Sequence, residues 1–202
     1  MEPLDGKPMP SHSVREAAVT ALLIAPHAVG SCGPTLGNLQ NSIHPFDCQV
    51  LLIERAQGGF YGGQLALPGG KMEPGELPIE TALREFKEEL GVDLQHPAVS
   101  ALHVGSLDAV YSPETQFLIH VMVVLARTLP QCDPEPTEVA AMLGMPLGAF
   151  DPRLPLQVHV EQHRGELLQF GAVPAPGKRR VWGLTARFLS ELAGRVAEVS
   201  GQ

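Results

Sequence analysis

The sequence predicts an α/β fold in which a mixed β-sheet is sandwiched by helices. Apolar runs of strand length alternate with turn-rich segments in both halves of the chain. Two other segments show the three- and four-residue spacing of apolar side chains that is typical of an amphipathic helix. Because strands lie before and after the first of these helices and the second closes the chain, the order is typical of a layered α/β domain.

The first predicted strand covers residues 17–25, where AAVTALLIA is an uncharged apolar run, although periodicity alone does not exclude a helix. Residues 26–45 follow, rich in Gly, Pro, Asn and Ser, and predict a long loop or insertion. Residues 48–53, CQVLLI, have strand character again. We therefore expect an antiparallel pair of strands joined by an unusually long connection.

The first helix is predicted at residues 78–90, after a flexible turn at 58–63 and a short strand that Pro68 and two glycines end. Gly91 provides the helix stop. The apolar side chains that define its buried face are Ile79, Ala82, Leu83, Phe86 and Leu90.

The second half of the chain predicts two further strands at residues 99–107 and 117–125, the latter strongly β-rich in FLIHVMVVL. A hairpin is predicted from residues 156–162 and 166–170, turning at HRGE. Residues 184–199 have apolar side chains four apart and predict a closing amphipathic helix.

The composition limits the classes of function. With 202 residues, 44% of them hydrophobic, we expect a single domain over residues 1–202. No apolar run approaches the roughly 20 residues of a membrane span and the N-terminus lacks a signal-peptide pattern, so we expect a soluble, cytoplasmic protein without a membrane partner. A net charge of -8 argues against binding to nucleic-acid backbone, which needs a basic face.

Three glutamates on the predicted helix form a cluster. Glu85, Glu88 and Glu89 are related by offsets of three, four and one, so they lie near one stripe, turned away from the apolar face. Such a stripe is most often solvated helix surface. The alternative is a metal cradle, because Mg²⁺ and Mn²⁺ prefer carboxylate oxygens and keep waters that substrate phosphates replace.

The residues around the cluster favour the metal cradle. Gly69 and Gly70 lie just upstream, where absent side chains let the backbone approach a metal ion or phosphates. Arg84 adjoins the carboxylates, and Glu76 is the candidate for a bidentate pair with it across the junction of loop and helix.

This segment resembles a known motif. From Gly70 to Val92 it is similar at every specified position to the Nudix box, Gly-x5-Glu-x7-Arg-Glu-U-x-Glu-Glu-x-Gly-U with U apolar. The resemblance implies a Nudix α/β/α sandwich with the box as a loop–helix–loop, and metal-dependent hydrolysis of a nucleoside diphosphate linked to another group. It also implies that Glu85 and Glu89 are the leading ligands of Mg²⁺ or Mn²⁺, with Glu88 beside them and Gly70 offering a carbonyl.

Such a reaction needs a base that accepts the proton of the attacking water. Glu88 is one candidate, and Glu138 in EPTEV and Glu114 in SPET are the others. An acidic loop of this kind is otherwise most often solvent-facing surface. We expect Arg84 to belong to the same catalytic site.

Segments outside the box resemble coenzyme A pyrophosphatases more narrowly. LLIERAQGGFYGGQLALPGG is similar to the segment before the box in that family, VWGLTARFL to its closing segment, and REAAVTALL to its first strand. The chain departs from the family at Tyr61, where His is typical, and at Leu67, where Phe is usual. The resemblance implies that coenzyme A is split into 3',5'-ADP and 4'-phosphopantetheine.

Few basic residues are available to meet the 3'-phosphate of coenzyme A. We take Arg55, Arg179 and Arg180 as candidate substrate-binding residues, the last two because GKRR is the densest positive charge in the chain. A basic cluster is, however, more often a solvated turn. Trp182, beside it, is interpreted as a packed residue that begins the last helix rather than as a platform for adenine.

The sequence leaves alternatives open for the substrate and for the class of function. ADP-ribose or another nucleotide sugar is the alternative substrate, and a nucleotide sensor without hydrolysis is the alternative of another class. The three closely spaced carboxylates argue against the sensor, since a pure binding module has no need of them. Nudix relatives often pair as dimers, and the sequence does not decide whether this chain forms a homodimer.

Overall fold

The computed structural model describes residues 14–25, 45–58, 61–128, 131–163 and 166–200. Most of the predicted loop at 26–45 therefore lies outside the described residues. Within the described ranges, no helix has the length and hydropathy of a membrane span.

The main sheet has eight strands in a mixed arrangement. Along its path the order is β3-β2-β1-β7-β5, and β8, β4 and β6 pair with β2, β1 and β7 in turn. β1 and β7 are parallel along ten residue pairs, and the other pairings are antiparallel. The strands are β1 (Arg15–Ile24), β2 (Gln49–Arg55), β3 (Leu65–Ala66), β4 (Gly69–Lys71), β5 (Ala101–Ser106), β6 (Val110–Ser112), β7 (Phe117–Ala126) and β8 (Val139–Pro146).

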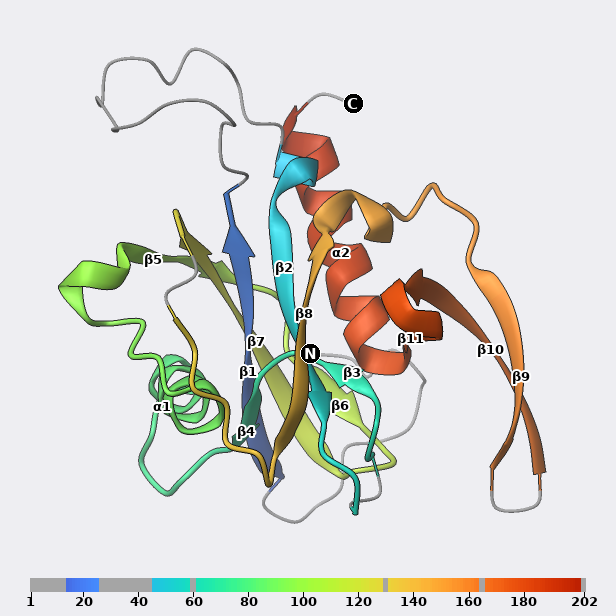
Figure 1. The fold of residues 1–202 in the computed structure, drawn as a ribbon, viewed down its shortest axis with the longest axis horizontal. Helices are drawn as coiled ribbons and strands as arrows, with labels where there is room; N and C mark the ends of the chain where they lie inside the picture. Colours follow the sequence, from blue (N-terminus) through green and yellow to red (C-terminus); the bar gives the residue numbers. More distant parts are fainter. Residues whose placement is uncertain (1–13, 26–44, 59–60, 129–130, 164–165, 201–202) are drawn as a thin grey trace.

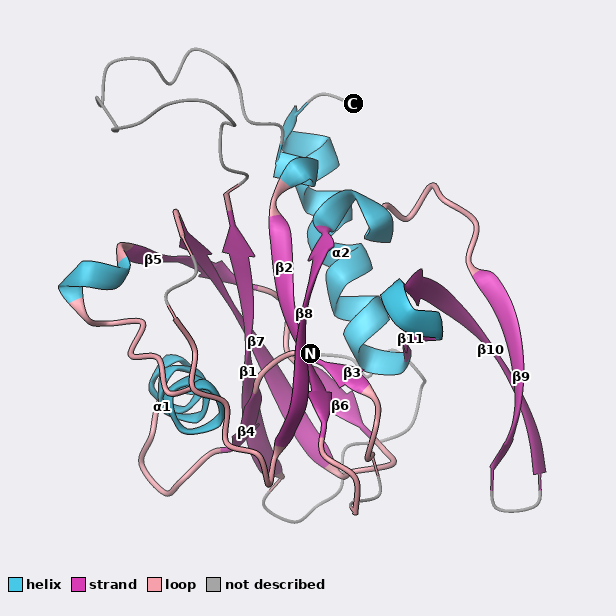
Figure 2. Ribbon diagram, viewed as in Figure 1, coloured by secondary structure: helices cyan, strands magenta, loops and turns pink. Residues whose placement is uncertain are grey.

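The two helices cover opposite faces of this sheet, as Figure 2 shows. Phe86 of α1 (Pro78–Leu90) belongs to the same core cluster as Leu51 of β2, whereas Phe188 of α2 (Gly183–Ser200) belongs to the cluster that contains Leu52. Because successive side chains of a strand point to opposite faces, one apolar strand supplies both cores. This is the predicted α/β sandwich.

A second, three-stranded sheet has the order β11-β10-β9. It consists of β9 (Gln157–His163), β10 (Glu166–Ala175) and β11 (Arg179–Trp182). Figure 1 shows β9 and the outer part of β10 extending away from the body of the molecule as a two-stranded arm. Short 3-10 helices complete the fold, at Pro45–Asp47, Pro97–Val99, Leu147–Phe150 and Pro176–Lys178.

The predicted helices and strands are found with shifts at their ends, and β4, β6, β8 and β11 are additional. β8 was not expected, because VAAMLGMP has weak strand propensity, and its antiparallel pairing with β2 overrides that weakness. β10 continues to Ala175, five residues beyond the predicted strand, because β11 pairs with its extension. Trp182 ends β11 instead of beginning the last helix, but it is packed as predicted, with its ring stacked on Phe170 at a centroid distance of 4.5 Å.

Candidate active site

The helix that carries the site is fixed at both ends. Pro78 occupies its first turn, and Glu80 accepts a hydrogen bond from the backbone N–H of Leu77 at 2.8 Å. At the other end Gly91 has a left-handed φ of 68° and its N–H donates to the carbonyl of Lys87 at 2.9 Å. The predicted bounds, residues 78–90, are confirmed.

Arg84 connects the helix to the loop before it. Its Nε and Nη2 donate to the two carboxylate oxygens of Glu76 at 2.7 and 3.0 Å, which is the predicted bidentate pair. Its Nη2 also donates to the carbonyl of Lys71, and its Nη1 donates to Glu85 and Glu88 at 2.9 Å each. The hydrogen bonds from Arg84, and then those from Thr81 and Glu73, lower the pKa of Glu76 to about 2.

Glu89 is the most buried of the three clustered carboxylates, with an exposed fraction of only 2%. One of its oxygens accepts a hydrogen bond from the backbone N–H of Gly69 at 2.9 Å. Burial raises the pKa of Glu89 to about 7, although this hydrogen bond and the charge of Arg55 act in the opposite direction. The expectation that the whole stripe faces away from the core is therefore wrong for Glu89, because β4 covers this side of α1.

The glycines of β4 make room for the carboxylates. Gly69 has a φ of 147° and lies so close to β1 that a Cβ would overlap the carbonyl of Ala18. A Cβ at Gly70 would overlap the carboxylate of Glu85. Burial also raises the pKa of Glu85, whereas the side chain of Glu88 is 58% exposed. The three glutamates thus form a gradient from buried Glu89 through half-buried Glu85 to exposed Glu88.

Two further charged residues, Arg55 and Glu138, act electrostatically on the clustered glutamates. Arg55 ends β2, where the pairing with β8 contains a bulge between Glu54 and Arg55, and its charge acts on Glu89. Glu138 precedes β8, and its carbonyl accepts a hydrogen bond from the N–H of Ala56 at 2.8 Å. The charge of Glu138 raises the pKa of both Glu85 and Glu89, so two parts of the chain, α1 and the segment before β8, bring carboxylates together.

These residues suit a divalent cation. Among the described residues no three acidic, His or Cys side chains are already arranged around one point for an ion. The donors are nevertheless the hard oxygens that Mg²⁺ and Mn²⁺ prefer, and their mutual repulsion is what a cation would relieve. Because Gly70 has no Cβ, the carboxylate of Glu85 lies directly against its backbone.

The predicted substrate-binding arginines are divided between two places. Arg55 lies with the carboxylates, whereas Arg179 forms an ion pair with Glu54 through a distance of 2.8 Å between Nε and Oε2. Arg180 places its guanidinium 5.9 Å from the ring centroid of Phe170. Glu54 was not singled out from the sequence, and no local pattern marks it, since its partner follows 125 positions later in the chain. Arg179 and Arg180 remain predicted substrate-binding residues.

The three candidates for the general base lie in different parts of the structure. Glu138 acts electrostatically on two of the clustered glutamates, and Glu88 contacts Arg84. Glu114 is exposed in the turn between β6 and β7. The geometry thus gives Glu138 and Glu88 the stronger claim to a role in the site.

Comparisons with known proteins agree with this arrangement. A family model for the NUDIX domain matches residues 42–163. The chain is 33% identical over 137 residues to a Yersinia enterocolitica protein described as "Uncharacterized Nudix hydrolase NudL", and the match covers 67% of each. It is 38% identical over 48 residues to 8-oxo-dGTP diphosphatase of Escherichia coli, covering 24% of this chain and 37% of that protein.

A solved structure supports the fold. The MutT/nudix family protein from Enterococcus faecalis matches with a TM-score of 0.52 at 16% identity, covering 96% of this chain and 66% of that chain. At this identity the similarity concerns the arrangement of the strands and helices.

Proposed function

This chain belongs to the Nudix family of hydrolases, which cleave pyrophosphate bonds in nucleotide derivatives, and we propose that the bond it cleaves is the diphosphate of coenzyme A. The hydrolysis of a diphosphate is inferred from one observation: the carboxylates of α1 lie against the glycines of β4. The choice of coenzyme A is supported by the segments before the box and at the closing helix, which resemble coenzyme A pyrophosphatases.

The metal ligands in this proposal are Glu85, Glu88 and Glu89, with the carbonyl of Gly70. When bound there, Mg²⁺ or Mn²⁺ supplies charge neutralisation of the diphosphate and makes a coordinated water more acidic. Glu89 is held in place by the N–H of Gly69, so its carboxylate needs little reordering. Arg84 orients both Glu85 and Glu88 and ties them to the loop through Glu76.

Arg55 is proposed to bind a phosphate oxygen of the substrate. Within the described residues its guanidinium has no hydrogen-bond or ion-pair partner, although its charge reaches Glu89. A guanidinium with unused donors beside a carboxylate cluster is suited to bidentate recognition of phosphate. Glu138 or Glu88 is proposed to accept the proton of the attacking water, and the exposure of both side chains lets the proton pass on to solvent.

ADP-ribose or another nucleotide sugar is the second candidate, and one observation favours it. Arg179, the residue proposed to meet the 3'-phosphate of coenzyme A, is already neutralised by Glu54. Binding of that phosphate through Arg179 requires the ion pair to open. ADP-ribose lacks the 3'-phosphate and makes no such demand.

The test is a side-by-side assay with coenzyme A, ADP-ribose, NADH and diadenosine polyphosphates, with Mg²⁺ or Mn²⁺ present and products identified by mass spectrometry. The proposal expects 3',5'-ADP and 4'-phosphopantetheine as the main products. Preferred cleavage of ADP-ribose with coenzyme A untouched would overturn the substrate assignment and leave the pyrophosphatase chemistry intact. Binding of a nucleotide without turnover of any substrate would instead support the sensor.

A further inference from the structure

The arm formed by β9 and the outer part of β10 has one bare apolar face. In the antiparallel register Val158 lies opposite Gly171, and Val160 lies opposite Gln169. Because directly opposed residues of an antiparallel pair share a face, these positions and Leu167 all lie on the same side of the arm. Val158, Val160 and Leu167 are 64%, 63% and 75% exposed.

The other face of the arm is used within the chain. There Phe170 stacks on Trp182, and Ala172 is completely buried. The bare face is also covered at its inner end, where Val173 packs into the core against α2. One strand face is therefore core at Val173 and open to solvent from Val158 outward. Contiguous exposed apolar side chains of this kind commonly mark an interaction site.

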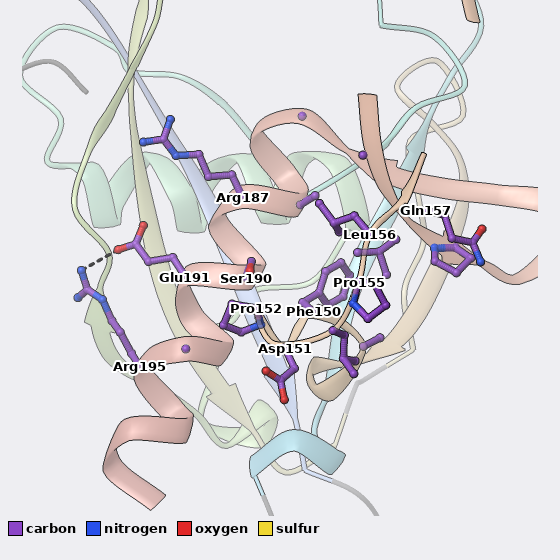
Figure 3. Close-up of a pocket in the computed structure, with 18 of the residues that line it drawn as sticks. Phe150, Asp151, Pro152, Pro155, Leu156, Gln157, Arg187, Ser190, Glu191 and Arg195 are labelled. Carbon is purple, nitrogen blue, oxygen red and sulfur yellow. Dashed lines mark hydrogen bonds and ion pairs between the residues drawn. The ribbon is translucent and has the colours of Figure 1, made fainter. Parts of the chain in front are cut away.

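A groove continues the bare face at the base of the arm. It has a volume of about 1060 Å³ and lies between α2 and the connection from the 3-10 helix at 147–150 to β9. Figure 3 shows Phe150, Pro155 and Leu156 gathered on one side of α2, with Arg187 and Arg195 pointing away from them. Leu156 fills the place of the missing side chain at Gly171 and is itself 56% exposed. The groove and the arm thus form one continuous apolar surface, which we call the arm face (Leu156, Val158, Val160 and Leu167).

We propose that the arm face packs against the same face of a second copy of this chain in a two-fold symmetric dimer. Leu167 lies opposite Gln162, so the midpoint between the outer residue Leu167 and the inner residue Leu156 falls between Val158 and Val160. A two-fold axis through this point places Val160 of each arm over Val158 of the other and lays Leu167 of each arm over Leu156 and the groove of the other.

The area of the ribbon alone is smaller than that of a standard interface, so the groove has to contribute. Seven residues of β9 span about 23 Å, and a two-stranded ribbon is about 10 Å wide, so the ribbon alone offers a few hundred Å². A standard interface buries about 800 Å² per partner. Packing the outer end of each arm into the opposite groove extends the contact toward this value. We expect a dimer with a dissociation constant on the order of 1 to 100 µM.

The chemistry of the face also favours a second copy over other partners. The arm-face residues are uncharged, so the contact between the two arms themselves desolvates no ionic group. A ligand small enough for the groove would leave Val160 and Leu167 exposed. The unpaired outer edge of β9 has no Pro or Lys to discourage association, as an edge strand facing only solvent commonly has.

Sedimentation velocity of the full chain over a range from about 1 to 200 µM tests this proposal. The wild type is expected to shift from monomer to dimer, and Val160→Glu should weaken association at least about tenfold because it buries an unpaired carboxylate of each copy in the apolar contact beside the axis. Leu102→Glu is the matched control. Leu102 is 63% exposed on β5, at the opposite edge of the main sheet, and its replacement should leave association unchanged.

Circular dichroism and metal-dependent turnover at low concentration verify that each variant is folded and active. As an independent readout, Val160→Cys should give a dimer that is cross-linked by a bis-maleimide of about 10 Å reach, the spacing of packed sheets, whereas Leu102→Cys should not. A wild-type chain that stays monomeric to the highest concentration overturns the proposal. So does a dimer that Leu102→Glu dissociates and Val160→Glu does not.

Discussion

The helix α1 and the arm of β9 and β10 depart from ordinary burial in opposite directions. α1 buries the carboxylate of Glu89 to 2% exposure, whereas the arm leaves Val160 63% exposed. Each departure costs free energy, because a charge loses solvent in the first region and apolar surface stays in water in the second. In α1 the proposed partner is a divalent cation, and in the arm the proposed partner is a second copy of the chain. An apparent mismatch between side chain and environment thus points to what each region binds.

The largest expected effect comes from removing a charged ligand in α1. Glu85→Gln and Glu89→Gln should each lower kcat by at least about 100-fold with Mg²⁺ present, because a neutral amide is a poor ligand for a hard cation. Steady-state kinetics on the preferred substrate measures this effect. Glu198→Gln, an exposed glutamate of α2, is the control and should retain wild-type kcat. Full turnover by either α1 variant would remove the catalytic role of the cluster.

Burial of Glu89 can be tested without a substrate. Its raised pKa means that the protonated carboxyl stabilises the metal-free fold below about pH 4.5, and that this contribution is lost as the pH rises through about 7. Glu89→Gln should therefore increase the free energy of unfolding by up to about 3 kcal/mol at about pH 8, from a shift of roughly 2.5 pKa units. Urea unfolding with a chelator present measures the difference.

The same difference should shrink progressively as the pH falls from about 7 to about 4.5. Glu88→Gln, at a side chain that is 58% exposed, serves as the matched control and should show little change with pH. An equal effect of Glu89→Gln at both ends of the pH range would contradict the raised pKa.

The connection between loop and helix gives a smaller effect. Arg84→Ala removes the bidentate pair with Glu76 and the contacts with Glu85 and Glu88, so the midpoint of thermal unfolding should fall by about 4 °C or more. Turnover should fall as well, because Glu85 loses its orientation. Glu88→Gln should lower the midpoint much less, and differential scanning fluorimetry compares the two. An identical midpoint for both variants would show that the connection through Arg84 contributes no stability.

The smallest expected effect concerns the second sheet. Replacing Arg179 and Arg180 by Gln should raise KM for coenzyme A several-fold and leave KM for dephospho-coenzyme A nearly unchanged, because only the former has a 3'-phosphate. Arg153→Gln, far along the chain and paired with Asp151, is the control. If the double variant only loses thermal stability and both KM values stay the same, Arg179 serves solely as the partner of Glu54.

Much of the site could be predicted because its residues are neighbours in sequence. The spacing from Gly70 to Val92 identified α1 between its true ends, the pair of Arg84 with Glu76, and the cluster of glutamates. These features depend on helical geometry and on contacts within about 20 residues, which the sequence encodes locally. The strands with strong apolar or β-rich patterns were predicted for the same reason.

The sequence alone therefore determined which side chains form the glutamate cluster and on which helix they lie. Only the tertiary structure decided that Glu89 is buried, that β8 exists, and that Glu54 neutralises Arg179. Each of these depends on a partner distant in the chain: β4 lies over Glu89, β2 pairs with the weak β8 segment, and β11 delivers Arg179. Burial and ion pairing are properties of the surroundings of a residue, and distant strands supply those surroundings only once the chain has folded.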